Sequence, residues 1–174
     1  RNLDFENLRS GIQLMLWGYF KKLIIADRAG VLVNTVFDNY DSYSGSIIAL
    51  AVFFYCIQLY CDFSGGIDTA RGVAHLFGVN LAENFRRPIF ADSVADYWRR
   101  WHITLGSWMR DYVFYPISLS KPFMKLGKFS RKHFSGVFGK ILPTSLATFI
   151  VYLIIGIWHG SDPKYIVYGF WNGI

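Results

Sequence analysis

The stretch SYSGSIIALAVFFYCIQLYC, residues 42–61, decides the class of this fold, because it runs for twenty residues without a formal charge. A helix needs about 20 residues to cross the hydrocarbon core of a bilayer. A second stretch, ILPTSLATFIVYLIIGIWHGS at 141–161, is as long, and His159 is its only residue that titrates near neutral pH. Neither stretch has the polar face that a helix packed in a soluble core shows. Both are therefore predicted to be transmembrane helices.

The overall composition agrees with a membrane protein. Residues of the hydrophobic class make up 53% of the chain, whereas soluble domains are about 45–50% apolar even with glycine counted. Cys56 and Cys61 lie five residues apart, on different faces of a helix and without the spacing of metal ligands, so we expect free packing thiols and no metal site. The expected fold class is all-α, a polytopic integral membrane protein with two clear spans plus interfacial and re-entrant helices. We expect residues 1–174 to be part of a single membrane domain that is truncated at both ends.

Charge predicts the orientation of residues 62–140, which connect the two spans. Between Arg71 and Lys140 there are twelve Lys and Arg residues against four Asp and Glu. Loops rich in Lys and Arg stay on the cytoplasmic side of a membrane, and they also attract anionic lipid headgroups. This placement accounts for the net charge of +6 without a nucleic-acid partner.

Outside the two spans, local patterns predict shorter elements. Residues 11–37 suit a helix that is interfacial, or buried among other helices with its charges at the rim. Residues 62–92, punctuated by glycine, suggest short helices and turns. Ser93 with Asp96 resembles a capping box, and the aromatic pattern that follows predicts one amphipathic helix ended by Pro116. Residues 118–140 are predicted to be a basic loop.

Two histidines stand in similar settings, in Trp101-His102 and Trp158-His159. Burial in a low-dielectric segment favours the neutral imidazole, which can accept a proton as a general base. Gly160 would let the second helix break after His159. The alternative is that each imidazole only hydrogen-bonds a backbone carbonyl between helices.

Other titratable residues are weaker candidates. His75 and His133 look like packing or solvated residues. Asp62 closes the first apolar stretch, and it could either cap a helix at the interface or orient an imidazole or an arginine. No serine sits in the GxSxG setting of a serine nucleophile, and the glycine pair after Asp62 lacks the spacing of a nucleotide-binding loop.

Three blocks of sequence resemble the membrane-bound O-acyltransferase (MBOAT) family. They are QLYCDFSGGIDTARGVAHLFGVNLAENFRRPI at 58–89, YWRRWHITLGSWMRDYVFYPI at 97–117 and GIWHGSDPKYIVYGFWNGI at 156–174. Within the family they look most like the membrane subunits that O-acetylate alginate and other bacterial polysaccharides, and more distantly like the D-alanyl transferase of teichoic acids. Gly106 and the run Ser161-Asp162-Pro163 depart from the pattern and leave the acceptor polymer open.

The resemblance implies that an acyl group, most simply acetyl, passes from a cytoplasmic thioester to a hydroxyl of an envelope polysaccharide. It implies that His159 is the base that takes the hydroxyl proton, and that His102 shapes or polarises the site on the side of the thioester donor. Trp101, Arg99, Arg100, Asp62 and Trp158 are implied as residues that support the site or line the substrate path; positive groups near the thioester carbonyl would stabilise the developing oxyanion.

The implied setting is a bacterial plasma membrane. The implied co-substrate is acetyl-CoA or an acylated carrier protein, with no bound cofactor. Membrane lipids, the polysaccharide acceptor and a possible extracytoplasmic SGNH-hydrolase-like acyltransferase are the implied partners. Two alternatives from other classes stay open: a transporter of polysaccharide or lipid-linked sugar, and a non-catalytic scaffold for envelope assembly.

Overall fold

The computed structural model describes residues 4–173, which fold almost entirely into helices. The all-helical prediction is confirmed, and the only β pairing in this described range is a single bridge between Phe85 and Trp101. The chain divides into two compact units, Arg1–Trp101 and His102–Ile174. Each unit contains one helix long and apolar enough to cross a membrane, α3 (Gly45–Leu76) and α8 (Gly136–His159).

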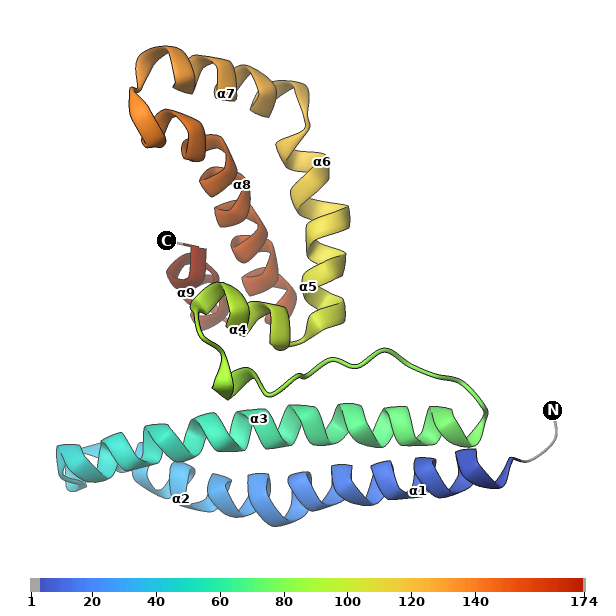
Figure 1. Ribbon diagram of the computed structural model, residues 1–174. Helices are drawn as coiled ribbons and strands as arrows, with labels where there is room; N and C mark the ends of the chain where they lie inside the picture. Colours follow the sequence, from blue (N-terminus) through green and yellow to red (C-terminus); the bar gives the residue numbers. More distant parts are fainter. Residues whose placement is uncertain (1–3, 174) are drawn as a thin grey trace. The chain divides into compact units, whose positions relative to one another are not determined.

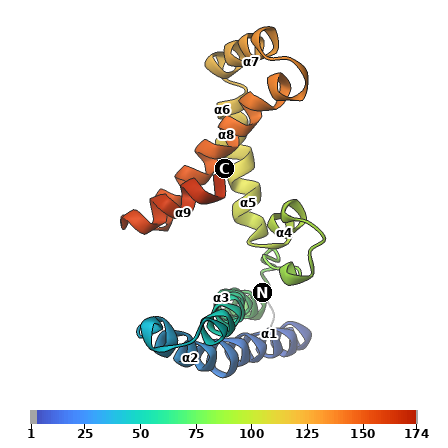
Figure 2. The same ribbon diagram turned by 90° about the vertical axis from the view of Figure 1, so that its left-hand side faces the viewer.

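The first unit is a pair of long antiparallel helical rods. One rod consists of α1 (Phe5–Tyr19), a π-helical segment η1 (Phe20–Ala26) and α2 (Asp27–Phe37), which follow one another without a break in helical backbone. After the short η2 (Tyr40–Ser42), α3 returns alongside this rod (Figure 1). The view turned by 90° shows the same neighbours (Figure 2). The mixed apolar stretch 11–37 is therefore helical, as predicted, and it packs against α3.

Glycines set the distance between these two rods. A Cβ added to Gly11 would lie 2.8 Å from the carbonyl oxygen of Gly72, and one added to Gly18 would lie 2.5 Å from that of Gly65. In each helix the two glycines are seven residues apart, so they fall on one face and meet in antiparallel register. Small residues at such a seam let helix backbones approach closely, as is common between membrane helices.

A buried ion pair joins the rods beside this seam. Lys21 Nζ donates to Asp68 Oδ2 at 2.8 Å and to Ser64 Oγ at 2.9 Å, and its side chain is only 8% exposed. The neighbouring Lys22 pairs instead with Asp27 and Asp62 at the surface of the unit. Residues 11–37 thus carry one of their charges inside the helix pair rather than only at its rim.

The helix α3 extends well past the uncharged stretch, so the prediction of short helices and turns directly after residue 61 was wrong. Gly65 and Gly72 lie inside the helix and contact α1, whereas Gly66 has open space beside it. The chain becomes irregular only after Leu76, with Gly78 at φ 68°. Glycines that indicate turns in a soluble chain here mark a close helix contact.

The end of the first unit contains η3 (Pro88–Phe90) and α4 (Val94–Arg100). Ser93 is the N-cap of α4, where its Oγ accepts a hydrogen bond from the Asp96 N–H at 3.1 Å, so the predicted helix start is confirmed. The predicted single amphipathic helix is wrong, because α4 ends at Trp101 and His102 takes a left-handed conformation with φ 43°.

The second unit packs its shorter helices against α8. It begins with α5 (Ile103–Met109), the π-helical η4 (Arg110–Phe114) and α6 (Tyr115–Ser118), so Pro116 lies in the first turn of a helix and does not end one. It continues with α7 (Lys121–His133), α8 and α9 (Pro163–Gly173).

The predicted basic loop at 118–140 is mostly the helix α7. This helix packs on the start of α8, where the buried Ser130 Oγ donates to the Gly139 carbonyl oxygen at 2.9 Å. At the other end of α8, Gly156 and Gly169 bring α9 against it: a Cβ on either glycine would come within 3.2 Å of the other's Cα. The short α8–α9 connection carries the strongest candidate for chemistry.

Candidate functional site

His159 is the last residue of α8, and the chain turns sharply after it. Gly160 has φ 153° and lies against the Tyr165 ring, so that an added Cβ would be 2.7 Å from a ring carbon. Only glycine fits this conformation and this contact without strain. The predicted break after His159 is confirmed, and it leaves the imidazole exposed at the end of a long apolar helix.

Two tyrosine rings from α9 lie near the exposed His159 imidazole. The Tyr165 ring lies nearly parallel to it with centroids 6.2 Å apart, and the Tyr168 ring meets it edge-on at 5.6 Å. Trp158 contacts it from α8 at 5.1 Å. Because α9 is held against α8 by the glycine pair, these tyrosines limit the orientations open to the imidazole.

His102 begins the second unit as the N-cap of α5. Its left-handed backbone is uncommon for a residue with a Cβ and stores strain of about 1–3 kcal/mol, and such strained positions cluster at functional sites. Burial lowers the pKa of His102 below its usual value, and the positive charge of His159 lowers this pKa further. His102 is therefore held toward its neutral form.

The two histidines belong to one compact unit, and a positive charge on His159 would lower the pKa of His102. They come from opposite ends of that unit's sequence, the start of α5 and the end of α8. Two neutral imidazoles near one another can take up one proton and polarise a second group. This pairing is the chemical feature that sequence inspection could suggest only by resemblance.

The other predicted site residues lie in the first unit. Trp101 belongs to an aromatic cluster with Tyr60, Phe63, Phe85 and Tyr97; it stacks on Tyr97 at 5.7 Å and meets Phe85 edge-on at 5.0 Å. This cluster anchors the chain immediately before the left-handed turn at His102. The structure thus gives Trp101 a packing role within the first unit.

Arg99 and Arg100 both contact Asp96 on α4. Arg100 Nε pairs with Asp96 Oδ2 at 2.6 Å, while Arg99 is 73% exposed and its Nε lies 3.8 Å from Asp96 Oδ1. Asp62 Oδ1 pairs with Lys22 Nζ at 2.7 Å, and the role of Asp62 in orienting an imidazole or an arginine stays a prediction. Of the two cysteines, Cys61 is buried and Cys56 is exposed, and neither forms a disulfide within residues 4–173.

Sequence reasoning missed Tyr165 and Tyr168 as neighbours of His159, and it assigned no role to Lys21. A signal for the tyrosines was present, because Tyr165 and Tyr168 are three residues apart and share one face of a helix. Locating His159 against that face also required knowledge of the turn at Gly160.

Comparison with known proteins identifies the family of this helical chain. Residues 4–131 match the family model described as MBOAT, membrane-bound O-acyltransferase family, and the chain belongs to that family. The match ends before α8, so it includes His102 but not His159.

Individual relatives extend the similarity over the whole chain. The probable alginate O-acetylase AlgI of Pseudomonas aeruginosa is 33% identical over 174 residues, 100% of this chain and 30% of the relative. The peptidoglycan O-acetyltransferase of Helicobacter pylori is 32% identical over 172 residues, 99% of this chain and 29% of the relative. The teichoic acid D-alanyltransferase of Bacillus subtilis is 29% identical over 173 residues, 96% of this chain and 40% of the relative. The chain thus spans about a third of the length of these curated relatives.

Proposed function

We propose that this chain forms the catalytic part of an O-acyltransferase that transfers an acyl group, most simply acetyl, to hydroxyls of a bacterial cell-envelope polysaccharide. The observation that carries the proposal is the pairing of His102 and His159 within one helical unit. Membership of the family supports the reaction class, and the names of the relatives support an envelope polymer as acceptor.

In the proposed reaction, His159 is the general base and His102 acts on the donor side. The neutral imidazole of His159 takes the proton from the acceptor hydroxyl as the oxygen attacks the thioester carbonyl. A new C–O bond forms and the C–S bond breaks. The thiolate leaves, and the proton held by His159 restores the thiol. His102, whose pKa burial lowers so that its neutral form is favoured, can donate a hydrogen bond to the carbonyl oxygen where negative charge develops.

The donor and the setting belong to the same proposal. The donor is a cytoplasmic thioester, acetyl-CoA or an acylated carrier protein, and no bound cofactor takes part. The protein acts in the bacterial plasma membrane with α3 and α8 as spans, among membrane lipids, and with an SGNH-hydrolase-like extracytoplasmic acyltransferase as a candidate partner. Nothing in the proposed chemistry requires a metal ion.

The test of the proposed function is the ester content of the envelope. Cells that lack the gene are compared with cells that carry the full-length protein, and ester-linked acetyl on purified polysaccharide is quantified after mild alkaline release. We expect the ester to disappear with the gene and to return with it, at unchanged polymer yield.

The transporter alternative predicts a different result from the same cells. The ion pair between Lys21 and Asp68 inside the first unit is the observation that favours it, because charged pairs within membrane helices can mark a transport path. A transporter would lower the amount of polymer outside the membrane while the ester content per sugar stayed constant. That outcome would replace the acyltransferase assignment.

The lowered pKa of His102 predicts how acyl transfer depends on pH. An unperturbed histidine has a pKa of about 6.5, and burial shifts that of His102 downward. The neutral form of His102 therefore persists below pH 6.5, so this residue should limit acyl transfer only once the pH passes through its lowered pKa. The measurement is NMR titration of the isotope-labelled His102 imidazole in the full-length protein; a titration midpoint at or above pH 6.5 would contradict the lowered pKa.

A further inference from the structure

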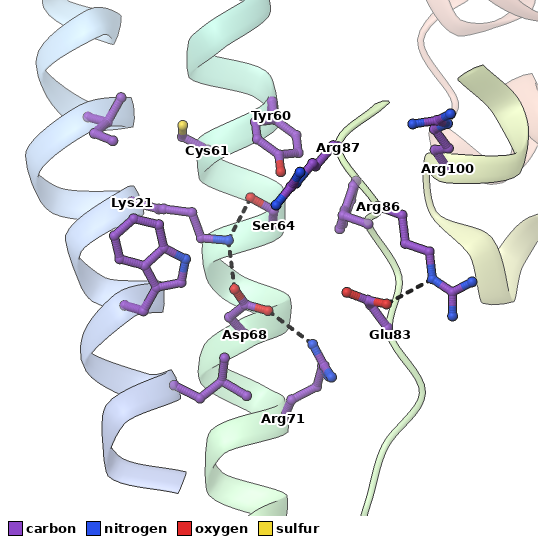
Figure 3. A pocket seen from close by; sticks show the side chains of 14 residues that line it. Lys21, Tyr60, Cys61, Ser64, Asp68, Arg71, Glu83, Arg86, Arg87 and Arg100 are labelled. Carbon is purple, nitrogen blue, oxygen red and sulfur yellow. Dashed lines mark hydrogen bonds and ion pairs between the residues drawn. The ribbon is translucent and has the colours of Figure 1, made fainter. Parts of the chain in front are cut away.

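An open pocket of about 740 Å³ lies in the first unit, between the two helical rods and the irregular segment that precedes α4 (Figure 3). Five cationic side chains line it, contributed by four separate parts of this unit: Lys21, Arg71, Arg86, Arg87 and Arg100. Its volume falls within the range of about 300–1,000 Å³ typical of small-molecule sites.

The pocket carries an excess of positive charge. Asp68 and Glu83 are its two acidic lining residues, against five cations. Asp96 lies outside the lining but neutralises Arg100 at 2.6 Å. Counting all three acids still leaves two positive charges without a matching carboxylate.

Arg71 supplies a buried donor that the protein leaves unused. Its Nη1 reaches Asp68 Oδ1 at 3.4 Å, a long contact, and its Nε is buried without a hydrogen-bond partner among the described residues. Asp68 is already occupied by Lys21 at 2.8 Å. The Arg71 side chain as a whole is 21% exposed and shares the Asp68 carboxylate with Lys21, so its positive charge is only partly neutralised and can act on a ligand in the pocket.

Arg87 presents a second cation from a strained backbone. Its φ of 48° and ψ of 57° are left-handed, although a proline follows it and restricts its conformation further. Within residues 4–173 it makes no ion pair. Its side chain points into the pocket beside Ser64 and Tyr60 (Figure 3).

We propose that this pocket binds a phosphate ester, with the guanidinium groups of Arg71 and Arg87 on the phosphate oxygens. Guanidinium groups match the several oxygens of a phosphate better than a lysine ammonium does, and two uncompensated charges suit a phosphate carrying one or two negative charges. Trp17, Tyr60 and Phe85 give the pocket apolar walls beside these cations, which suits an organic group attached to the phosphate. This chemistry is shared by a phospholipid headgroup and by the phosphorylated part of a soluble thioester donor.

The experiment measures equilibrium binding to the full-length protein in a neutral detergent. One probe is short-chain phosphatidylglycerol, with the matching diacylglycerol as its phosphate-free control; the other is adenosine 3′,5′-bisphosphate, the phosphorylated nucleotide part of coenzyme A. We expect at least one phosphate probe to bind, and we expect Arg87→Gln and Arg71→Gln each to weaken that binding about tenfold, because each removes one charge-assisted contact. Arg87→Lys keeps the positive charge but loses the planar set of guanidinium donors. Its affinity for the phosphate probe should lie between those of the wild type and Arg87→Gln.

Arg9→Gln is the matched control, since it removes the same charge from an exposed position on α1 where Arg9 pairs with Glu6. If the two arginine substitutions weaken binding of the lipid alone, the pocket is a headgroup site. If they weaken binding of the nucleotide alone, it is a site for the thioester donor. If they weaken binding of both probes, the site accepts either phosphate. Absence of binding by both probes, or equal loss in Arg9→Gln, overturns the proposal. Because the readout is binding, these outcomes are independent of whether acyl transfer is the correct reaction.

Discussion

Replacing His159 with alanine should lower acyl transfer by about 10²–10⁴-fold, the range that general acid–base catalysis contributes. The amount of protein in the membrane should stay the same. His159 is exposed at the end of α8, so its removal creates no buried cavity. Among the described residues, the substitution removes two ring contacts with α9, those to Tyr165 and Tyr168.

The measurement is transfer of labelled acetyl to polysaccharide in membranes matched for protein content. His133→Ala is the control, because it removes an imidazole to which no role in the reaction is assigned. His133 lies on α7, where its Nδ1 contacts the Phe129 carbonyl oxygen at 3.0 Å. His159→Gln should be as inactive as His159→Ala, since an amide fills space but cannot act as the base. Full transfer by His159→Ala would remove this residue from the proposed reaction.

Replacing Gly65 with leucine should destabilise the first unit by about 1–3 kcal/mol, the usual cost of overpacking a close contact. A Cβ at Gly65 would lie 2.7 Å from the Gly18 carbonyl oxygen and 3.3 Å from the Lys21 Cβ. The Gly18 carbonyl oxygen is a backbone atom, so it cannot rotate away from the new side chain as a side-chain atom could. The two rods would have to separate along the seam that also holds the buried ion pair.

The adjacent glycine gives a matched control. Gly66 has no atom within 4 Å of an added Cβ, so Gly66→Leu should leave stability nearly unchanged while adding the same side chain to the same helix. Thermal unfolding of the full-length protein in one detergent compares the two variants. Equal midpoints would contradict the close approach of α1 and α3.

The parts of the fold that the sequence predicts are those set by local composition. The two uncharged stretches became α3 and α8 because a long apolar helix satisfies its own backbone in a membrane. Ser93 capped α4 because its side chain and the Asp96 N–H are three residues apart, a purely local relation.

The parts that the sequence did not predict depend on contacts between distant residues. Nothing near His102 is glycine or proline with a turn preference, yet its backbone is left-handed beside the aromatic cluster around Trp101. The α7 helix was mistaken for a loop because the segment is basic and contains Gly and Ser, yet Gly127 and Ser130 are the buried residues of this helix and Ser130 bonds Gly139 of α8. The pairing of Lys21 with Asp68 joins residues 47 positions apart, which no local pattern reveals.

The bond between Lys21 and Asp68 also bears on the order in which this protein is built. A lysine at the centre of a lone helix raises the free energy of insertion by about 2.5–3.5 kcal/mol, and the rod formed by α1, η1 and α2 carries this lysine where only α3 neutralises it. The ribosome has synthesised that rod before the carboxylate of Asp68 exists. The first rod is therefore expected to reach its final position only after α3 has been synthesised and Asp68 can pair with Lys21.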